Sequence, residues 1–158
     1  MTVQFPTLRR GRRRARLAGV AAAVLGAEAT WAIARFVLGI RLQAPAGNGY
    51  PEPMDIGPLN VAVAVVVLSL VGWASLAGLE RLTAHAHRVW LVIALVGLAA
   101  SLSIPLRGAG VSASDRAVLV LMHVVVALVV IPVLYRTSLR RAEATAKFAS
   151  VGVRGEVA

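Results

Sequence analysis

The chain has 158 residues, of which 58% are hydrophobic, and a formal net charge of +10. Soluble domains are typically about 45–50% apolar, so this excess indicates that part of the chain lies in lipid. The chain has no cysteine, which excludes disulfides, cysteine-ligated metal centres and thiol redox chemistry.

Residues 1–16 form a basic segment. Its arginines are Arg9, Arg10, Arg12, Arg13, Arg14 and Arg16. Basic residues beside membrane helices collect on the cytoplasmic side and attract anionic headgroups, so we expect these arginines to contact lipid headgroups there. They are not interleaved with aromatic residues on a folded domain, as in many nucleic-acid-binding proteins, and we expect no nucleic-acid partner.

Four apolar segments follow, each close to the length of about 20 residues that a helix needs to cross the hydrocarbon core. They cover residues 17–40, 59–79, 89–106 and 117–135. The second and fourth are rich in valine, which favours strands in soluble proteins, but they are far longer than strands of about 4–8 residues. The sequence therefore predicts an all-α fold, a bundle of four transmembrane helices over residues 17–135.

The start of the chain also has features of a cleaved signal peptide, because small residues at Ala44–Ala46 follow the basic segment and the first apolar run. However, such apolar regions are about 7–15 residues long. The run here is longer and contains Glu28 and Arg35. We expect it to be retained as a helix.

Three links join the predicted spans. The first has four prolines and three glycines between Ala44 and Pro58, which excludes a continuous helix and predicts an irregular outer loop. In the second, His85 and His87 lie near Glu80, but residues two apart do not share a helical face, so we expect no metal site. In the third, Ser114 or Asp115 is expected to cap the last helix.

Orientation follows from the positions of lysine and arginine. The basic segment, the second link and the tail, residues 136–158, carry six, two and five of them. The opposite side would carry only Arg41, Arg107 and Arg116, while Arg35 falls within the first span. The bias predicts that both termini are cytoplasmic.

Polar residues within the spans are candidates for function, because charge in hydrocarbon costs several kcal/mol. At a rise of about 1.5 Å per residue, one polar residue of each helix lies about 15–18 Å from the cytoplasmic end, near the middle of the membrane. These residues are Glu28, Ser69, Ser101 and His123. The sequence predicts that they form a buried polar layer.

Glu28 and Arg35 are seven residues apart, so a regular helix would place them on nearly one face with Trp31 between them. In one interpretation, Glu28 exchanges a proton or binds a polar ligand, with His123 as its relay. In the other, Glu28 pairs with Arg35 or His123 and only holds helices together.

Small residues also repeat at helix-contact spacing, as in Ala74 with Gly78 and Gly97 with Ser101. Such faces serve contacts inside the bundle, with a second copy, or with another membrane protein. Trp90 and Tyr135 fall at the predicted membrane boundary, where aromatic residues are enriched. We expect them to anchor the helices there.

The layout consists of RLAGVAAAVLGAEATWAIARFVLGI, a Pro/Gly-rich loop, three further spans and an RRAE tail. Over about residues 15–141 it resembles the small four-helix membrane proteins of unknown activity that are common in actinobacteria. The resemblance implies a plasma-membrane location and brings no known activity or catalytic residue. We expect no cofactor. In its size and in the glutamate of its first helix, the chain also resembles small multidrug transporters. Its strong one-sided charge bias differs from the weak bias that is common among them.

Three functions are compatible with these features. The first is a non-enzymatic subunit or regulator of other membrane components, with anionic lipid as a further partner. The second is a proton-coupled transporter of a small lipophilic or cationic substrate that uses Glu28. The third is an enzyme acting on a lipidic substrate with Glu28 and His123 as acid and base.

Overall fold

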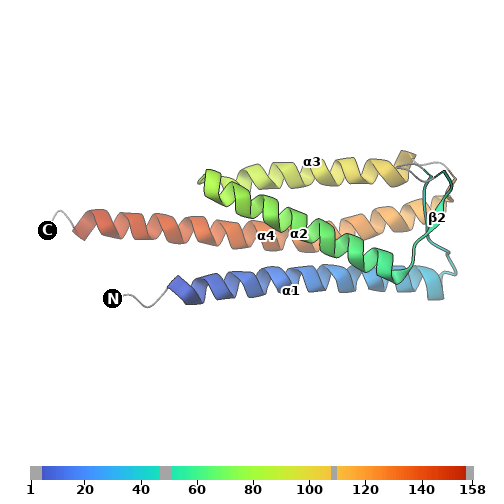
Figure 1. The fold of residues 1–158 in the computed structure, drawn as a ribbon, viewed down its shortest axis with the longest axis horizontal. Coiled ribbons are helices and arrows are strands. Elements are labelled where there is room, and N and C mark those ends of the chain that lie inside the picture. The colour runs from blue at the N-terminus through green and yellow to red at the C-terminus, as the bar shows by residue number, and fades with distance from the viewer. Residues whose placement is uncertain (1–4, 47–50, 108–109, 156–158) are drawn as a thin grey trace.

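Four long helices make up most of the described chain (Figure 1). The computed structural model describes residues 5–46, 51–107 and 110–155, and the side chains of residues 10–144 within those ranges. The helices are α1 (Phe5–Ala32), α2 (Pro58–Leu82), α3 (Ala86–Arg107) and α4 (Ala113–Gly155). All four are long and apolar enough to cross a membrane, which confirms the predicted all-helical fold with four apolar helices.

The helices run along one axis, and α2 crosses obliquely between α1 and α3 (Figure 1). The described part of α1 begins at the end of the bundle where the described part of α4 finishes. The other end carries a short antiparallel hairpin of β1 (Gln43–Ala44) and β2 (Met54–Asp55). We call these the tail end and the hairpin end of the bundle. The link predicted to be irregular thus contains a small ladder, which Ile56 extends by donating its backbone N–H to the Leu42 carbonyl at 2.9 Å.

Helix ends and predicted segment ends do not coincide at the tail end. The described chain is helical from Phe5, within the basic segment, and α4 continues from Tyr135 to Gly155 without a break. Alanine and arginine, which are frequent in both stretches, are strong helix formers, so nothing there ends a helix. Where the helices leave the lipid stays a prediction.

Ser112 caps α4, in place of the expected Ser114 or Asp115. The Ser112 carbonyl accepts the backbone N–H of Arg116 at 3.2 Å. Its hydroxyl accepts the backbone N–H of Asp115 at 3.1 Å, and the Asp115 carboxylate accepts the backbone N–H of Ser112 at 3.2 Å. This reciprocal arrangement is a capping box, in which the acidic residue occupies the third helical position.

The interior of the bundle is built on small residues of α1. Ala23 and Ala27 are fully buried and pack in one cluster with Val65 of α2 and Met122 of α4. A second cluster joins Leu76, Trp90 and Leu134. Large apolar side chains on the outside are exposed, which indicates a surface suited to lipid rather than water.

Trp90 differs from its expected place at the membrane boundary. Its side chain is buried, and the indole donates a hydrogen bond to the Gly72 carbonyl at 2.9 Å. A second contact, 3.2 Å long, reaches the Ser75 hydroxyl. Trp90 therefore joins α3 to α2 inside the bundle instead of anchoring α3 in lipid.

Candidate functional site

Glu28 and His123 lie at about the same level on neighbouring antiparallel helices. A Cβ atom built on Gly26 would lie 3.0 Å from Val125 Cγ1, so these two positions face each other across α1 and α4. Glu28 follows Gly26 by two residues, and His123 precedes Val125 by two. The Glu28 side chain is half-buried, and its Oε1 atom is buried with no hydrogen-bond partner among the described residues.

The other members of the predicted polar layer bond to their own helices or lack a partner. His123 Nδ1 lies 2.7 Å from the Leu119 carbonyl oxygen, and the Ser101 hydroxyl donates to the Leu98 carbonyl at 2.8 Å. Short polar side chains in helices often bond to a carbonyl three or four residues earlier. Ser69 is buried, and its hydroxyl has no hydrogen-bond partner in the described chain.

These four side chains do not form a connected network. Within the described ranges, no hydrogen bond joins any two of Glu28, Ser69, Ser101 and His123. The acid–base pair that an enzyme would need is therefore not hydrogen-bonded in this structure. Two of the four side chains, those of Glu28 and Ser69, have a buried oxygen without a hydrogen-bond partner in the described chain. Of these two, only Glu28 is ionisable.

Arg35 does not pair with Glu28 in the described chain, and α1 does not end as a regular helix. Residues Ile33–Val37 form a π-helical turn, η1, in which the Leu38 N–H bonds to the Ile33 carbonyl five residues earlier, at 3.1 Å. A π-helical turn has more residues per turn than an α-helix, so the side chains within it are rotated from the positions that regular helical spacing predicts. Arg35 is exposed, and no ion pair between it and Glu28 exists in the described part of the chain.

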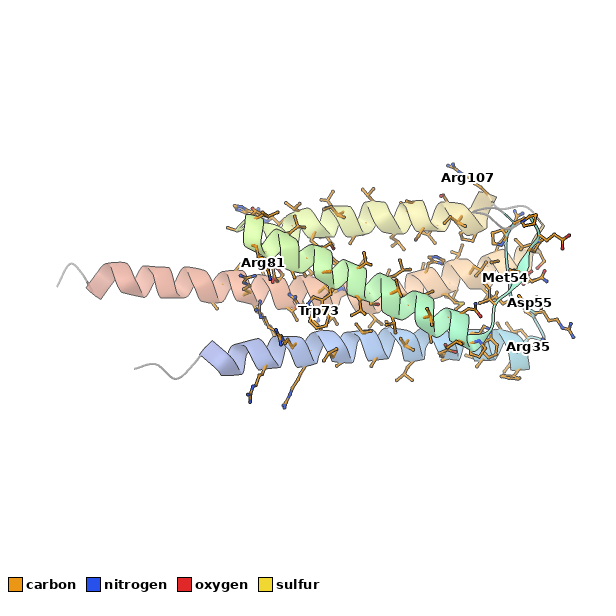
Figure 2. The ribbon with its side chains drawn as sticks, in the orientation of Figure 1. Arg35, Met54, Asp55, Trp73, Arg81 and Arg107 are labelled. Carbon is orange, nitrogen blue, oxygen red and sulfur yellow. The ribbon has the colours of Figure 1, made fainter. Side chains whose placement is uncertain are left out.

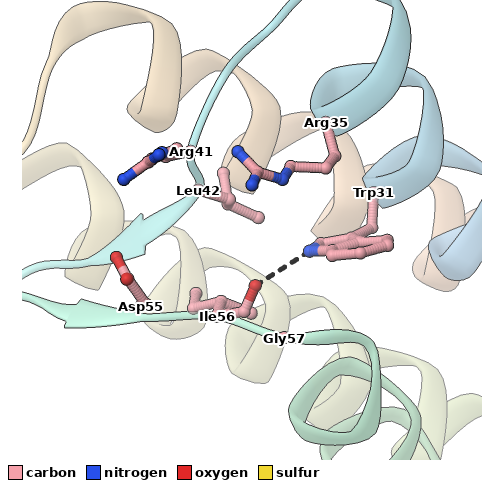
Figure 3. A pocket seen from close by; sticks show the side chains of 7 residues that line it. All are labelled: Trp31, Arg35, Arg41, Leu42, Asp55, Ile56 and Gly57. Atoms are coloured by element: carbon pink, nitrogen blue, oxygen red, sulfur yellow. Dashed lines mark hydrogen bonds between the residues drawn. The ribbon is translucent and has the colours of Figure 1, made fainter.

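Arg35 instead lines a hollow at the hairpin end, with a volume of about 340 Å³ (Figure 3). Trp31 forms one wall and donates its indole N–H to the Ile56 carbonyl at 2.8 Å, which joins α1 to the segment before α2. Arg41, Leu42 and Asp55 also line the hollow. Arg35 and Trp31 therefore lie together beside this hollow at the hairpin end of the bundle.

A buried charge cluster at the tail end was not expected from the sequence. The Glu80 carboxylate on α2 lies 2.7 Å from Arg16 of α1 and 2.8 Å from Arg141 of α4. Arg12 is 3.7 Å away. The side chains of Glu80 and Arg16 are only 6% and 5% exposed, so three helices meet at a desolvated ion pair.

Arg16 is held on three sides. Its Nε atom donates to the Thr137 hydroxyl at 3.0 Å, and its guanidinium lies 5.9 Å from the ring centroid of Trp73, which is labelled in Figure 2. The Trp73 distance is within the range of a cation–π contact. Arg16 therefore lies inside the bundle. The headgroup contact that was predicted for it as part of the basic segment is wrong.

The other arginines of the basic segment differ in exposure where their side chains are described. Arg10, Arg13 and Arg14 are exposed, and Arg12 is partly exposed. The side chain of Arg9 lies outside the described residues. Headgroup contact by these arginines stays a prediction.

Of the two histidines of the second link, His87 contributes to packing. His87 is buried and its ring meets the Tyr135 ring edge-on, with 5.6 Å between centroids. His85 is exposed. In the part of the chain that the structure describes, no group of three or more histidine, aspartate or glutamate side chains could hold a metal ion.

Residues 7–140 match a family described as a family of unknown function (DUF6069). No curated protein and no solved structure matches the chain.

Proposed function

The chain belongs to this family of unknown function, DUF6069, and we propose that it is a non-enzymatic multi-pass membrane protein that acts as a subunit or regulator through helix contacts. The observation that carries the proposal is one uncovered face of α2. Its residues recur at alternating intervals of four and three and are all exposed. They are Asn60, Ala64, Val67, Val71, Ala74 and Gly78.

This exposed α2 face has the features of a helix-packing surface. Alternating intervals of three and four keep side chains on one seam between paired helices, and small residues allow close backbone approach in lipid. A Cβ atom at Gly78 would meet nothing within 4 Å. The hairpin-end half of the face is also hollowed, over a volume of about 450 Å³ lined by Asn60, Ala64 and Val67 among others.

Replacement of small residues on the exposed α2 face tests the proposal. We expect the wild-type protein, extracted in mild detergent, to migrate in native gels as a complex larger than one chain. Ala64→Leu with Gly78→Leu should reduce it to a single chain by blocking helix approach, whereas the matched control Gly97→Leu on exposed α3 should not. A wild-type protein that is a single chain, or a complex that survives the double substitution, contradicts the proposal.

A proton-coupled transporter is the second candidate, and the unsatisfied buried Oε1 of Glu28 favours it. An ionisable side chain within a membrane-spanning helix is a default candidate for a site of proton exchange or ligand binding. Uptake of tetraphenylphosphonium, a lipophilic cation, into proteoliposomes should then depend on a pH gradient and vanish in Glu28→Gln. Glu52→Gln in the exposed loop is the control, and uptake without a gradient rejects this function.

We also propose that the bundle lies in the plasma membrane with both termini cytoplasmic. The excess of arginine at the tail end supports this orientation. Exposed Arg10, Arg13 and Arg14 would then face the anionic inner leaflet, where each basic residue contributes about 1 kcal/mol to membrane attraction.

A further inference from the structure

The hollow at the hairpin end has an excess of positive charge. Two guanidinium groups, those of Arg35 and Arg41, and one carboxylate, that of Asp55, line it. Asp55 accepts a hydrogen bond from the Gln43 amide at 2.9 Å across the hairpin. Within the described ranges, neither arginine forms an ion pair. Two like charges on one hollow attract an anion that can lie between them.

The shape of the guanidinium group favours phosphate as that anion. Arginine presents a planar fork of N–H donors that matches two oxygens of a phosphate group. Figure 3 shows the Arg35 side chain extending over the hollow toward Leu42, so its donors are directed across the opening rather than into the helix. The volume of about 340 Å³ is large enough for a phosphate with part of its substituent.

The surroundings of the hollow indicate that the phosphate belongs to a lipid. One wall is the ring of Trp31, whose amphipathic side chain suits the boundary between headgroups and acyl chains. Phe36 packs edge-on against it, with 5.8 Å between ring centroids, and is 77% exposed. Val37 is 74% exposed. The charged hollow therefore adjoins an apolar surface that acyl chains can cover.

We propose that this hollow binds the phosphate group of an anionic phospholipid in the leaflet at the hairpin end of the bundle. Arg35 and Arg41 donate to the phosphate oxygens, and Trp31 with Phe36 lies against the glycerol and upper acyl region. Asp55 opposes the anion and thereby limits its affinity. This site is separate from the exposed α2 face on which the proposed function rests.

Native mass spectrometry of the detergent-solubilised protein tests the site. Phosphatidylglycerol and phosphatidylcholine with identical acyl chains are added separately, and the fraction of protein that retains one lipid is measured. We expect preferential retention of phosphatidylglycerol. Arg35→Gln with Arg41→Gln should abolish the preference, at about fivefold loss of affinity for each arginine, which corresponds to about 1 kcal/mol per charge.

Two further variants keep the test specific. Arg107→Gln removes another exposed arginine at the hairpin end, whose side chain points away from the bundle in Figure 2, and should leave the preference unchanged. Asp55→Asn removes the opposing charge but keeps an oxygen that can accept from Gln43, so phosphatidylglycerol retention should rise about fivefold. Unchanged retention in the double variant, or a decrease in Asp55→Asn, overturns the proposal.

Inorganic phosphate distinguishes a lipid from a free anion. We expect millimolar inorganic phosphate to leave phosphatidylglycerol bound, because the free ion makes no contact with the apolar walls. If inorganic phosphate displaces the lipid as effectively as added phosphatidylglycerol does, the hollow binds a soluble anion and the lipid assignment is wrong.

Discussion

Glu80 and Arg16 illustrate how much a single side chain can contribute to holding the helices together. Both are almost fully buried, and their ion pair joins α2 to α1, while Arg141 adds α4. Removing one partner of a buried pair leaves the other charge without compensation, which costs more than the net energy of the intact pair. The tail end of the bundle should therefore be sensitive to loss of the Glu80 charge.

Glu80→Gln should destabilise the protein by about 3 kcal/mol, because Arg16 would remain buried without a counter-charge. In mild detergent, the thermal midpoint of tryptophan fluorescence, to which Trp73 beside Arg16 contributes, should fall by roughly 10 °C. Glu52→Gln, at an exposed position, is the matched control and should leave the midpoint unchanged. An equal midpoint in Glu80→Gln and the wild type would show that this pair does not hold the helices.

The sequence could not identify this pair, because Arg16 and Glu80 are 64 residues apart. Arg16 is the last of several arginines in the basic segment, and Glu80 begins a link that otherwise looks basic and solvated. The one available signal was topological: antiparallel helices joined by a hairpin bring the start of α1 to the level of the end of α2. Glu28 was identifiable as an intramembrane carboxyl, but the π-helical turn that separates Arg35 from it has no signature in helical spacing.

At the scale of elements, contact between α1 and α4 depends on glycine. A Cβ atom built on Gly19 would lie 2.8 Å from Val133 Cγ1, closer than atoms approach without a shift. Valine is stiff at χ1 and cannot easily move away. Glycine at this position therefore sets the distance between these two helices.

Gly19→Ala should lower stability by about 1–3 kcal/mol through overpacking. Gly97→Ala, whose added methyl group would meet nothing within 4 Å, should instead be neutral or stabilising by about 0.5–1 kcal/mol, because alanine favours the helix. Thermal midpoints of the two variants in the same detergent make the comparison. Equal changes in both would mean that helix propensity alone, and not close contact, governs position 19.

The capping box of α4 gives a second prediction for an element. Ser112→Ala removes the side-chain acceptor for the Asp115 N–H and should cost about 1 kcal/mol. Amide hydrogen exchange in the first turn of α4 should accelerate about fivefold, because a loss of about 1 kcal/mol raises the population of the open state by that factor. Ser114→Ala should have a smaller effect because that hydroxyl contacts only the Ser112 hydroxyl, at 2.7 Å, among the described residues. Faster exchange in Ser114→Ala than in Ser112→Ala contradicts this assignment.

The sequence was informative about which segments are helical and much less about how they end and meet. Apolar runs of sufficient length identified α1 to α4, since few structures other than a helix satisfy the backbone in lipid. The cap was placed two or three residues late because Ser112, Ser114 and Asp115 are all acceptable caps. Small residues at helix-contact spacing were recognised, but only the structure shows that Gly19 and Gly26 face α4 while Gly78 faces outward.

For the whole molecule, the apolar outside is as important as the packed inside. Leu25, Leu59 and Leu128 are each about 70% exposed or more, at 69%, 74% and 70%. At about 25 cal/mol per Å² of apolar surface, such residues on every side would strongly favour removal from water. Lipid provides that removal without further protein contacts.

The arrangement of the whole molecule predicts which side of the membrane each end of the bundle faces. Because the chain has no cysteine, single cysteines can be introduced to test this topology. Single cysteines replace three exposed residues: Gly11 near the start of α1, Glu52 at the hairpin end and Glu143 on α4. In sealed right-side-out vesicles, a membrane-impermeant maleimide should label Glu52→Cys. Gly11→Cys and Glu143→Cys should react only after the membrane is opened. Labelling of Gly11→Cys and Glu143→Cys from opposite sides, or of all three cysteines from one side, would contradict four crossings with both ends in the cytoplasm.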